Sequence, residues 1–533
     1  GGFRRSNVQM NIEMNVNERL KVGASMNGRI EDRRHPGVPG GDDTWLPRFA
    51  TMKNQPTKRP FANDNPNYPQ LVSDQPETNF AILNYETTGK VSDVWRVIQM
   101  NGTAEYEILK GLKFKGMLGY YYAYNELDNQ EFTYELYGYN EQTDSYYVTN
   151  RMSNPYRERN REKVEDQFSN FQLNFDRKFG KHAVVAVAGF EASQRKRPKM
   201  WIHSTPVSNA MDLIRLKEIQ EFNDDGNRTE ARMGYLGRIN YSYMDKYLIE
   251  TILRADASAK FPQNSRWGYF PSVSLGWVLS QESFMKSLKA IDNIKLRASY
   301  GESGNDNVGS FKYLAGYAFD GSYKIGDEIK SGLYAVGLAN PILTWETMKI
   351  YNGGIDLSFF NRKLYGTVDA FYRVRDGIPG SRSVSLPSSF GAELPLENLN
   401  SIDTRGWELN LGTSGNFGNF MYDISGNLSW ARSKWRKYDE PIYSDPDQER
   451  IYKREGRWTD VRYGYISDGL FTSQAEIEAL DFTYKDLNGN SSLRPGDIKY
   501  VDLNGDKVLD WKDQKEIGKG TLPTWTYGFN MNF

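Results

Sequence analysis

Residues 7–16 read NVQMNIEMNV, in which apolar and polar side chains alternate without a break. A period of two is typical of a β-strand, so Val8, Met10 and Ile12 share one face and the polar residues share the other. From Val8 to Val16 such a strand spans roughly 27 Å, or about 21 Å vertically at a tilt near 40°, close to the apolar band of about 25 Å on outer-membrane barrels. Strands of soluble proteins average only about 5–6 residues.

Composition supports extended β-structure and excludes several other classes. The 533 residues include 35 Tyr, 27 Phe, 12 Trp and 48 Gly, but no Cys and only three His. Disulfide scaffolds and thiol nucleophiles are therefore excluded, and a zinc site is disfavoured. A net charge of -1 gives no reason to expect a nucleic-acid partner.

The same alternation recurs along the chain, and its partner face carries charges such as Lys295, Asp356 and Asp369. A wet lumen accepts such charges, whereas lipid does not. We expect fifteen strands, near residues 7–17, 20–31, 95–109, 112–126, 166–178, 182–193, 230–243, 247–258, 268–281, 291–301, 345–360, 363–376, 403–413, 419–433 and 524–533.

The connections between these strands fall into two length classes. Short polar turns are expected at 17–19, 110–112, 178–181, 244–246, 361–363 and 415–419. Long segments rich in Pro, Asn, Asp and Tyr occupy 33–94, 127–165, 194–229, 302–344, 377–402 and 434–523. Short turns at one end and long loops at the other are typical of a transmembrane β-barrel with periplasmic turns and extracellular loops. The sequence thus predicts an all-β fold, a transmembrane antiparallel β-barrel.

The number of strands predicts further sequence before residue 1. The first and last expected strands both run towards the periplasm, whereas a closed bacterial barrel has an even number of strands. The opening residues GGFRRSN include neither a starting Met nor a secretion signal. We therefore expect residues 1–533 to form the C-terminal portion of a barrel.

Several sequence motifs along the chain resemble those of a known protein family. They are 254–258 (RADAS), 266–277 (RWGYFPSVSLGW), 296–305 (LRASYGESGN), 340–346 (NPILTWE) and 495–500 (PGDIKY) followed by 502–506 (DLNGD). In this order they resemble the barrel of SusC/RagA-family TonB-dependent outer-membrane transporters of Bacteroidota. The resemblance spans about half of the chain.

The resemblance implies a barrel of about 22 strands, in the size class of plugged transporters. It also implies a preceding plug domain, a TonB-contacting segment and a signal peptide, none of which lies in this sequence. A SusD-like surface lipoprotein, the TonB complex and outer-membrane lipid are the implied partners. The expected substrate is an oligosaccharide or a peptide, taken up across the outer membrane of a Gram-negative cell.

One group of residues in the expected extracellular loop 459–523 has the spacing of a calcium site. Positions 1, 3, 5, 7, 9 and 12 of an EF-hand-like loop are occupied by Asp502, Asn504, Asp506, Val508, Asp510 and Asp513. Lys507 stands where the EF-hand loop usually has Gly, and Asp513 replaces the bidentate Glu. The alternative interpretation is a solvated Asn/Asp/Gly-rich turn. Calcium is the only cofactor that we expect.

Three functions remain open on the sequence alone. The leading one is an energy-coupled importer; the others are a passive porin and a calcium-stabilised surface adhesin or glycan-processing enzyme. No catalytic constellation is evident, so we expect no enzyme activity. The importer requires Leu275 and Ile355 to face outward and Ser274 to face inward.

Overall fold

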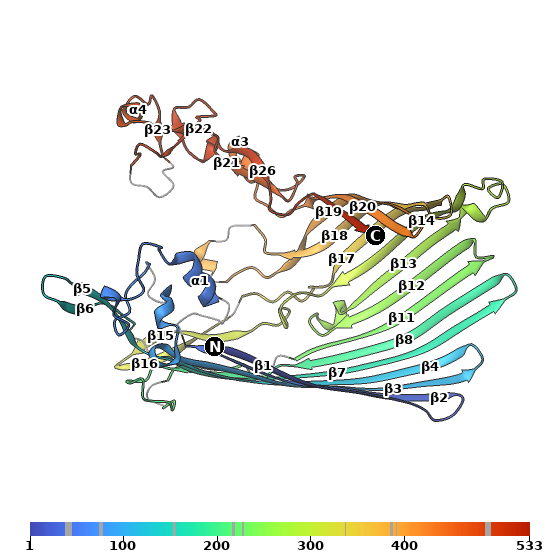
Figure 1. Ribbon diagram of the computed structural model, residues 1–533, viewed down its shortest axis with the longest axis horizontal. Helices are drawn as coiled ribbons and strands as arrows, with labels where there is room; N and C mark the ends of the chain where they lie inside the picture. The colour runs from blue at the N-terminus through green and yellow to red at the C-terminus, as the bar shows by residue number, and fades with distance from the viewer. Residues whose placement is uncertain are drawn as a thin grey trace. The chain divides into compact units, whose positions relative to one another are not determined.

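A computed structural model describes residues 1–37, 45–73, 78–152, 156–215, 219–225, 229–335, 337–383, 387–390, 392–485 and 492–533. The chain divides into two compact units. Unit 1 comprises Gly1–Asn174 and Gly189–Met233, and unit 2 comprises Phe175–Ala188 and Gly234–Phe533. Each unit is built mainly of long antiparallel strands (Figure 1). No helix in the described part of the chain is both long and apolar enough to cross a membrane.

All fifteen expected strands are present in the described residues and belong to one large sheet. They are β1 (Gly2–Asn15), β2 (Leu20–Pro36), β3 (Gly89–Leu109), β4 (Leu112–Glu131), β7 (Tyr156–Phe179), β8 (His182–Lys196), β11 (Thr229–Tyr243), β12 (Tyr247–Ser258), β13 (Trp267–Val278), β14 (Ile291–Asn305), β17 (Glu346–Phe359), β18 (Leu364–Gly380), β19 (Glu397–Phe417), β20 (Phe420–Lys437) and β27 (Trp525–Asn532). The antiparallel fold predicted from alternation is confirmed.

Several strands extend further than the sequence predicts. β7 begins at Tyr156 rather than near 166, and β3 begins at Gly89 rather than near 95. The added part of β7, 156–165, reads YRERNREKVE, which has no apolar stripe. Backbone pairing continues there, for example with β9, but the alternation that revealed the rest of the strand is absent.

Parts of the expected long loops form smaller strands and short helices. β9 (Lys199–Ser204) and β10 (Ile219–Asp225) join the large sheet. The other small elements are α1 (Trp45–Lys53), α2 (Tyr85–Thr88), β5 (Tyr134–Asn140), β6 (Ser145–Met152), β15 (Tyr317–Ile325), β16 (Glu328–Ala335), α3 (Pro446–Tyr452), β21 (Val461–Gly464), β22 (Ser467–Leu470), α4 (Gln474–Glu478), β23 (Thr483–Tyr484), β24 (Ile498–Tyr500), β25 (Val508–Leu509) and β26 (Lys515–Lys519).

Short turns connect the strand pairs β1–β2, β3–β4, β7–β8, β11–β12, β17–β18 and β19–β20, as predicted, whereas residues 279–290 form a longer connection between β13 and β14. At the β1–β2 turn, the Asn17 side chain accepts hydrogen bonds from the amides of Arg19 and Leu20, both at 2.9 Å. At the β11–β12 turn, Met244 and Asp245 have φ of 55° and 57°. Two consecutive residues with positive φ match the twist of the flanking strands.

At the other end, buried polar side chains fasten the long connections. In unit 1, Arg157 is only 2% exposed and donates to the carbonyls of Glu131, Asn209 and Met211 at 2.8–2.9 Å. A buried guanidinium must satisfy its donors, so this one holds the segment around 209–211 against β4 and β7.

In unit 2, the motif 340–346 serves a similar purpose. The Trp345 indole donates to the Arg266 carbonyl at 2.8 Å, and the Thr344 amide donates to Asn398 at 3.1 Å. Leu343 is fully buried. The motif 340–346 therefore joins its own connection, between β14 and β17, to the β12–β13 connection at Arg266 and to the start of β19 at Asn398.

Candidate functional site

The wall of unit 2 has one apolar and one polar face, and the strand register shows this directly. Directly opposed residues in antiparallel strands lie on the same face. One unbroken row across eight strands is apolar: Tyr247, Trp277, Leu296, Ile355, Val368, Leu409, Leu428 and Tyr527. Five of these side chains are exposed, including Ile355 (39%) and Tyr527 (82%), and Leu296, Leu409 and Leu428 are half-buried. Exposed apolar rows of this length suit contact with lipid.

The adjacent row, one residue along each strand, is charged or polar at five of its eight positions. It contains Leu248, Gly276, Arg297, Gly354, Asp369, Glu408, Ser429 and Thr526. Three charged residues would not be tolerated on a lipid face. This row therefore belongs to the inner, hydrated face.

Arg297 is the centre of a charge network on the inner face. From β14 its guanidinium donates to Asp356 of β17 at 3.0 and 3.1 Å, and to Asp369 of β18 at 3.0 and 2.9 Å. Two carboxylates on one guanidinium fix its orientation and connect three neighbouring strands.

The predicted faces of Leu275, Ile355 and Ser274 agree with this register. Leu275 is 51% exposed and lies opposite Ile249 and Ala298, on the same face as the apolar row. Ser274 lies opposite Glu250 and Ser299, on the face that carries Arg297.

Unit 1 repeats the same division. The row Met10, Met26, Met100 and Tyr120 is apolar, and the adjacent row Asn11, Ser25, Asn101 and Gly119 is polar. Within the polar row the Asn101 amide donates to Ser25 at 3.1 Å. The stretch at 7–16 is thus a strand with differently solvated faces.

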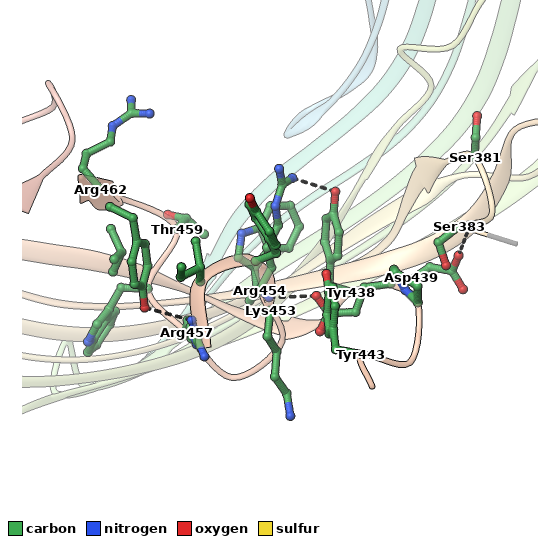
Figure 2. Close-up of a pocket in the computed structure, with 18 residues that line it drawn as sticks. Ser381, Ser383, Tyr438, Asp439, Tyr443, Lys453, Arg454, Arg457, Thr459 and Arg462 are labelled. Atoms are coloured by element: carbon green, nitrogen blue, oxygen red, sulfur yellow. Dashed lines mark hydrogen bonds between the residues drawn. The ribbon is translucent and has the colours of Figure 1, made fainter. Parts of the chain in front are cut away.

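The connections in unit 2 include a pocket of about 650 Å³ beyond the end of β20 (Figure 2). Its lining comes from residues 381–383, from the end of β20 and from residues 438–463. Backbone pairing holds part of this lining in place: the Thr459 amide donates to the Ser433 carbonyl, and the Gly456 amide to the Trp435 carbonyl. The pocket is therefore built against a long strand, which is a rigid support.

Basic and aromatic side chains alternate in this lining. Arg454 donates to the Tyr438 hydroxyl at 2.7 Å and lies 4.9 Å from that ring's centre. Arg457 donates to the Tyr463 hydroxyl at 2.8 Å. Figure 2 shows both contacts. Our sequence interpretation missed this pocket, although the run KREGRWTDVRY at 453–463 was a signal for it.

The pKa values of several titratable groups in and next to this lining are shifted. Burial raises the pKa of the Tyr443 hydroxyl, and the nearby Glu440 charge adds to the effect, although Arg454 opposes it. Lys453 lowers the pKa of Glu449 through a hydrogen bond of 2.6 Å. Tyr443 thus remains a hydrogen-bond donor at neutral pH, whereas Lys453 is already paired.

The six residues of the expected calcium site lie between β24 and β26, where backbone amides engage their oxygens. Asp502 accepts from the amides of Gly505 (2.8 Å) and Lys507 (2.9 Å). The Asn504 side chain accepts from the Asp506 amide at 2.9 Å, and that of Asp506 from the Val508 amide at 2.8 Å.

Asp510 and Asp513 close the loop. The Asp510 side chain accepts from the Lys512 amide at 3.0 Å. Asp513 is fully buried and accepts from the amides of Leu503 and Asp510 at 2.9 and 2.8 Å. Lys507, at the usual glycine position, has the positive φ (65°) that this position of the loop requires.

These contacts hold the loop in a series of tight turns. Across the described residues, no three His, Cys, Asp or Glu side chains gather as a metal-ion site. Calcium at Asp502, Asn504, Asp506, Val508, Asp510 and Asp513 stays a prediction.

Comparisons with known proteins agree with this architecture. A family model for TonB dependent receptor-like β-barrels matches residues 26–528. TonB-dependent receptor P39 of Formosa agariphila is 26% identical over 575 residues, covering all of this chain and 51% of that protein. TonB-dependent receptor SusC of Bacteroides thetaiotaomicron is 29% identical over 284 residues, covering 50% of this chain and 28% of SusC.

Among solved structures, one described as the RagAB peptide transporter matches with a TM-score of 0.72 and 20% sequence identity. That match covers 99% of this chain and 56% of the solved chain. The chain thus spans about half the length of P39 and of the matched RagAB chain. It belongs to the TonB-dependent receptor β-barrel family, with relatives of the SusC and RagA type, and its place is the outer membrane of a Gram-negative bacterium.

Proposed function

We propose that this chain forms barrel wall and extracellular loops of an energy-coupled importer for oligosaccharides or peptides. The observation that carries the proposal is the pair of adjacent rows in unit 2, apolar on one face and charged on the other, within a chain that matches the TonB-dependent receptor barrel. A lipid-facing surface and a hydrated inner surface on the same strands are what a transmembrane conduit requires.

The partners in this proposal are the TonB complex and a SusD-like surface lipoprotein. SusC is named a TonB-dependent receptor, and the matched RagAB structure is described as a peptide transporter. Both relationships favour import over the passive porin or the surface adhesin. The proposed activity is transport, without catalysis.

Uptake in the native bacterium tests the energy coupling. Deleting the gene that encodes this chain should abolish accumulation of a fluorescent oligosaccharide or peptide that supports growth, and a protonophore should abolish accumulation in the parent strain. The deletion strain complemented with the gene is the control. Uptake that depends on the gene but persists with the protonophore would identify a passive pore and contradict the proposal.

A separate measurement tests the partner. An affinity-tagged copy of the full-length protein, extracted in mild detergent, should co-purify with a SusD-like lipoprotein in near-equal amounts. A preparation from an unrelated tagged outer-membrane barrel serves as the control. If the lipoprotein is equally abundant in both preparations, the partner must be withdrawn from the proposal.

A further inference from the structure

The pocket beyond β20 has an excess of positive charge. Lys453, Arg454, Arg457 and Arg462 contribute four cations to its lining, against the two carboxylates of Asp439 and Glu440. The Lys453 ammonium is paired with Glu449 at 2.6 Å. Within the described residues, however, no carboxylate forms an ion pair with any of the three arginines.

Both acidic residues of the lining are occupied by backbone amides. Glu440 accepts from the amides of Arg454 (2.8 Å) and Glu455 (3.2 Å), and Asp439 accepts from the Ser383 amide at 2.6 Å. Their hydrogen bonds thus hold the loop in place, and the guanidinium groups, which pair with neither carboxylate, keep the capacity to bind an anion.

Two of the arginines are held in place before any ligand arrives. Arg454 rests on the Tyr438 ring, and Tyr438 is in turn supported by Trp435, at 4.6 Å between ring centres. Arg457 donates to the Glu449 carbonyl at 2.9 Å as well as to Tyr463. A guanidinium with restricted motion loses less entropy when it binds a ligand.

The remaining lining is rich in hydroxyl groups. Ser381, Ser383, Thr459 and the tyrosines at 438, 443 and 463 all contribute to it. Hydroxyls and guanidinium groups bind a hydroxylated, negatively charged ligand well. The lining also includes the aromatic rings of Trp435 and Trp458 and the apolar side chains of Ile451 and Val461. The volume of about 650 Å³ lies within the usual range for ligand pockets.

We propose that this pocket binds an acidic oligosaccharide. Carboxylate or sulfate groups at separate places along the sugar contact Arg454, Arg457 and Arg462, which point in different directions (Figure 2), and the sugar hydroxyls bind the Ser, Thr and Tyr side chains. The inference rests on the proposed function, because it assigns a substrate class to the extracellular side of the importer. In this proposal, the connection that follows β20 distinguishes negatively charged sugars from neutral ones.

Binding to the full-length purified protein tests the inference. The probes are galacturonic acid hexamer, its methyl ester, a carrageenan hexasaccharide, neutral maltohexaose and hexaglutamate peptide, each titrated by calorimetry. At least one acidic sugar should bind about tenfold more tightly than the neutral probes. The carboxylate and sulfate probes distinguish the two sources of negative charge.

Variants of exposed arginines locate the site. The double variant Arg454→Gln/Arg462→Gln should weaken acidic-sugar binding by about tenfold or more. Arg494→Gln is the matched control, because Arg494 is exposed in the same connection but outside the pocket lining. Independently of any variant, raising NaCl from about 50 to 500 mM should weaken the wild-type interaction.

Three results would overturn the inference: equal binding of the acid hexamer, the carrageenan and the neutral probes; an equal loss in Arg494→Gln; or arginine-dependent binding of hexaglutamate alone, which would identify an acidic peptide site. Gene-dependent, energy-coupled uptake without a preference for acidic sugars would overturn only this inference. Arginine-dependent sugar binding with uptake unaffected by gene deletion would instead overturn the transport proposal.

Discussion

Replacing Ile355 with arginine should strongly impair assembly into the outer membrane. Ile355 lies in the apolar row between Leu296 and Val368 and is 39% exposed. It is four residues from Phe359, the end of β17. At a rise of about 3.4 Å per residue and a tilt near 40°, this distance is about 10 Å, close to the middle of an apolar band of about 25 Å. Arginine at such a depth costs about 2–4 kcal/mol.

Two other positions in the same unit calibrate this value. Leu275 is only two residues from Trp277, whose indole donates to Glu282 at 3.1 Å, as expected near the membrane interface. Its depth is about 5 Å, so Leu275→Arg should cost about 1–2 kcal/mol. Ser274→Arg should cost about 0–1 kcal/mol, because the new side chain faces the hydrated side opposite Glu250.

The assay is the heat-modifiable band of the full-length protein in outer-membrane fractions, followed by urea titration of the assembled protein. The expected order of damage is Ile355→Arg, then Leu275→Arg, then Ser274→Arg. Equal defects at all three positions, or the largest defect at Ser274, would refute the assignment of the two faces. Equal defects at Ile355 and Leu275 alone would refute the estimate of depth.

Three further predictions concern the connections. Burial raises the pKa of the Glu131 carboxyl from about 4.5 to about 7. Between these two pH values the carboxyl ionises in the unfolded chain but stays protonated in the folded chain. The local free energy of unfolding should therefore fall between about pH 4.5 and 7, by up to about 3 kcal/mol. Glu131→Gln should abolish this dependence in hydrogen exchange of residues 205–215, and an unchanged pH profile would contradict it. Calcium at about 1 mM is expected to protect residues 502–513 from protease in the wild type but not in Asp506→Asn, and equal digestion with and without calcium would exclude the site. Asn398→Ala removes hydrogen bonds of 2.8–3.1 Å to Thr344 and Gly377 and should destabilise these loops by about 1–3 kcal/mol. Limited proteolysis measures the effect, with Lys330→Ala as the control. Equal digestion of the two variants would contradict the role of Asn398 in fastening the loops.

Alternation predicted the strands because it reflects a constraint that acts at every residue. Each of the fifteen strands has lipid on one side and a hydrated face on the other, so residues such as Val8, Met10 and Ile12 must repeat with a period of two. The extension of β7 to Tyr156 escaped prediction, because paired backbone beyond the membrane carries no such requirement. The same absence of a repeating constraint concealed the small strands inside the long connections.

The calcium loop and the arginine pocket were predicted less completely from the sequence than the strands were. Spacing along the chain identified Asp502 to Asp513 as a candidate site, but it did not predict that Asp513 would be buried and occupied by the amides of Leu503 and Asp510. The basic run at 453–463 was visible in the sequence. Its pairing with the end of β20, and the approach of Ser383 to Asp439, were not.

By itself, the sequence determined the fifteen long strands, the face on which their alternating side chains lie and the family, because these depend on neighbours along the chain. Only the tertiary structure decided which residues align across strands, such as Ile355 with Val368 and Arg297 with its two aspartates, and which loop segments enclose a pocket. Register and loop packing join residues tens of positions apart. They are fixed by hydrogen bonding and burial when the chain folds back on itself, and a local period of two carries no record of that.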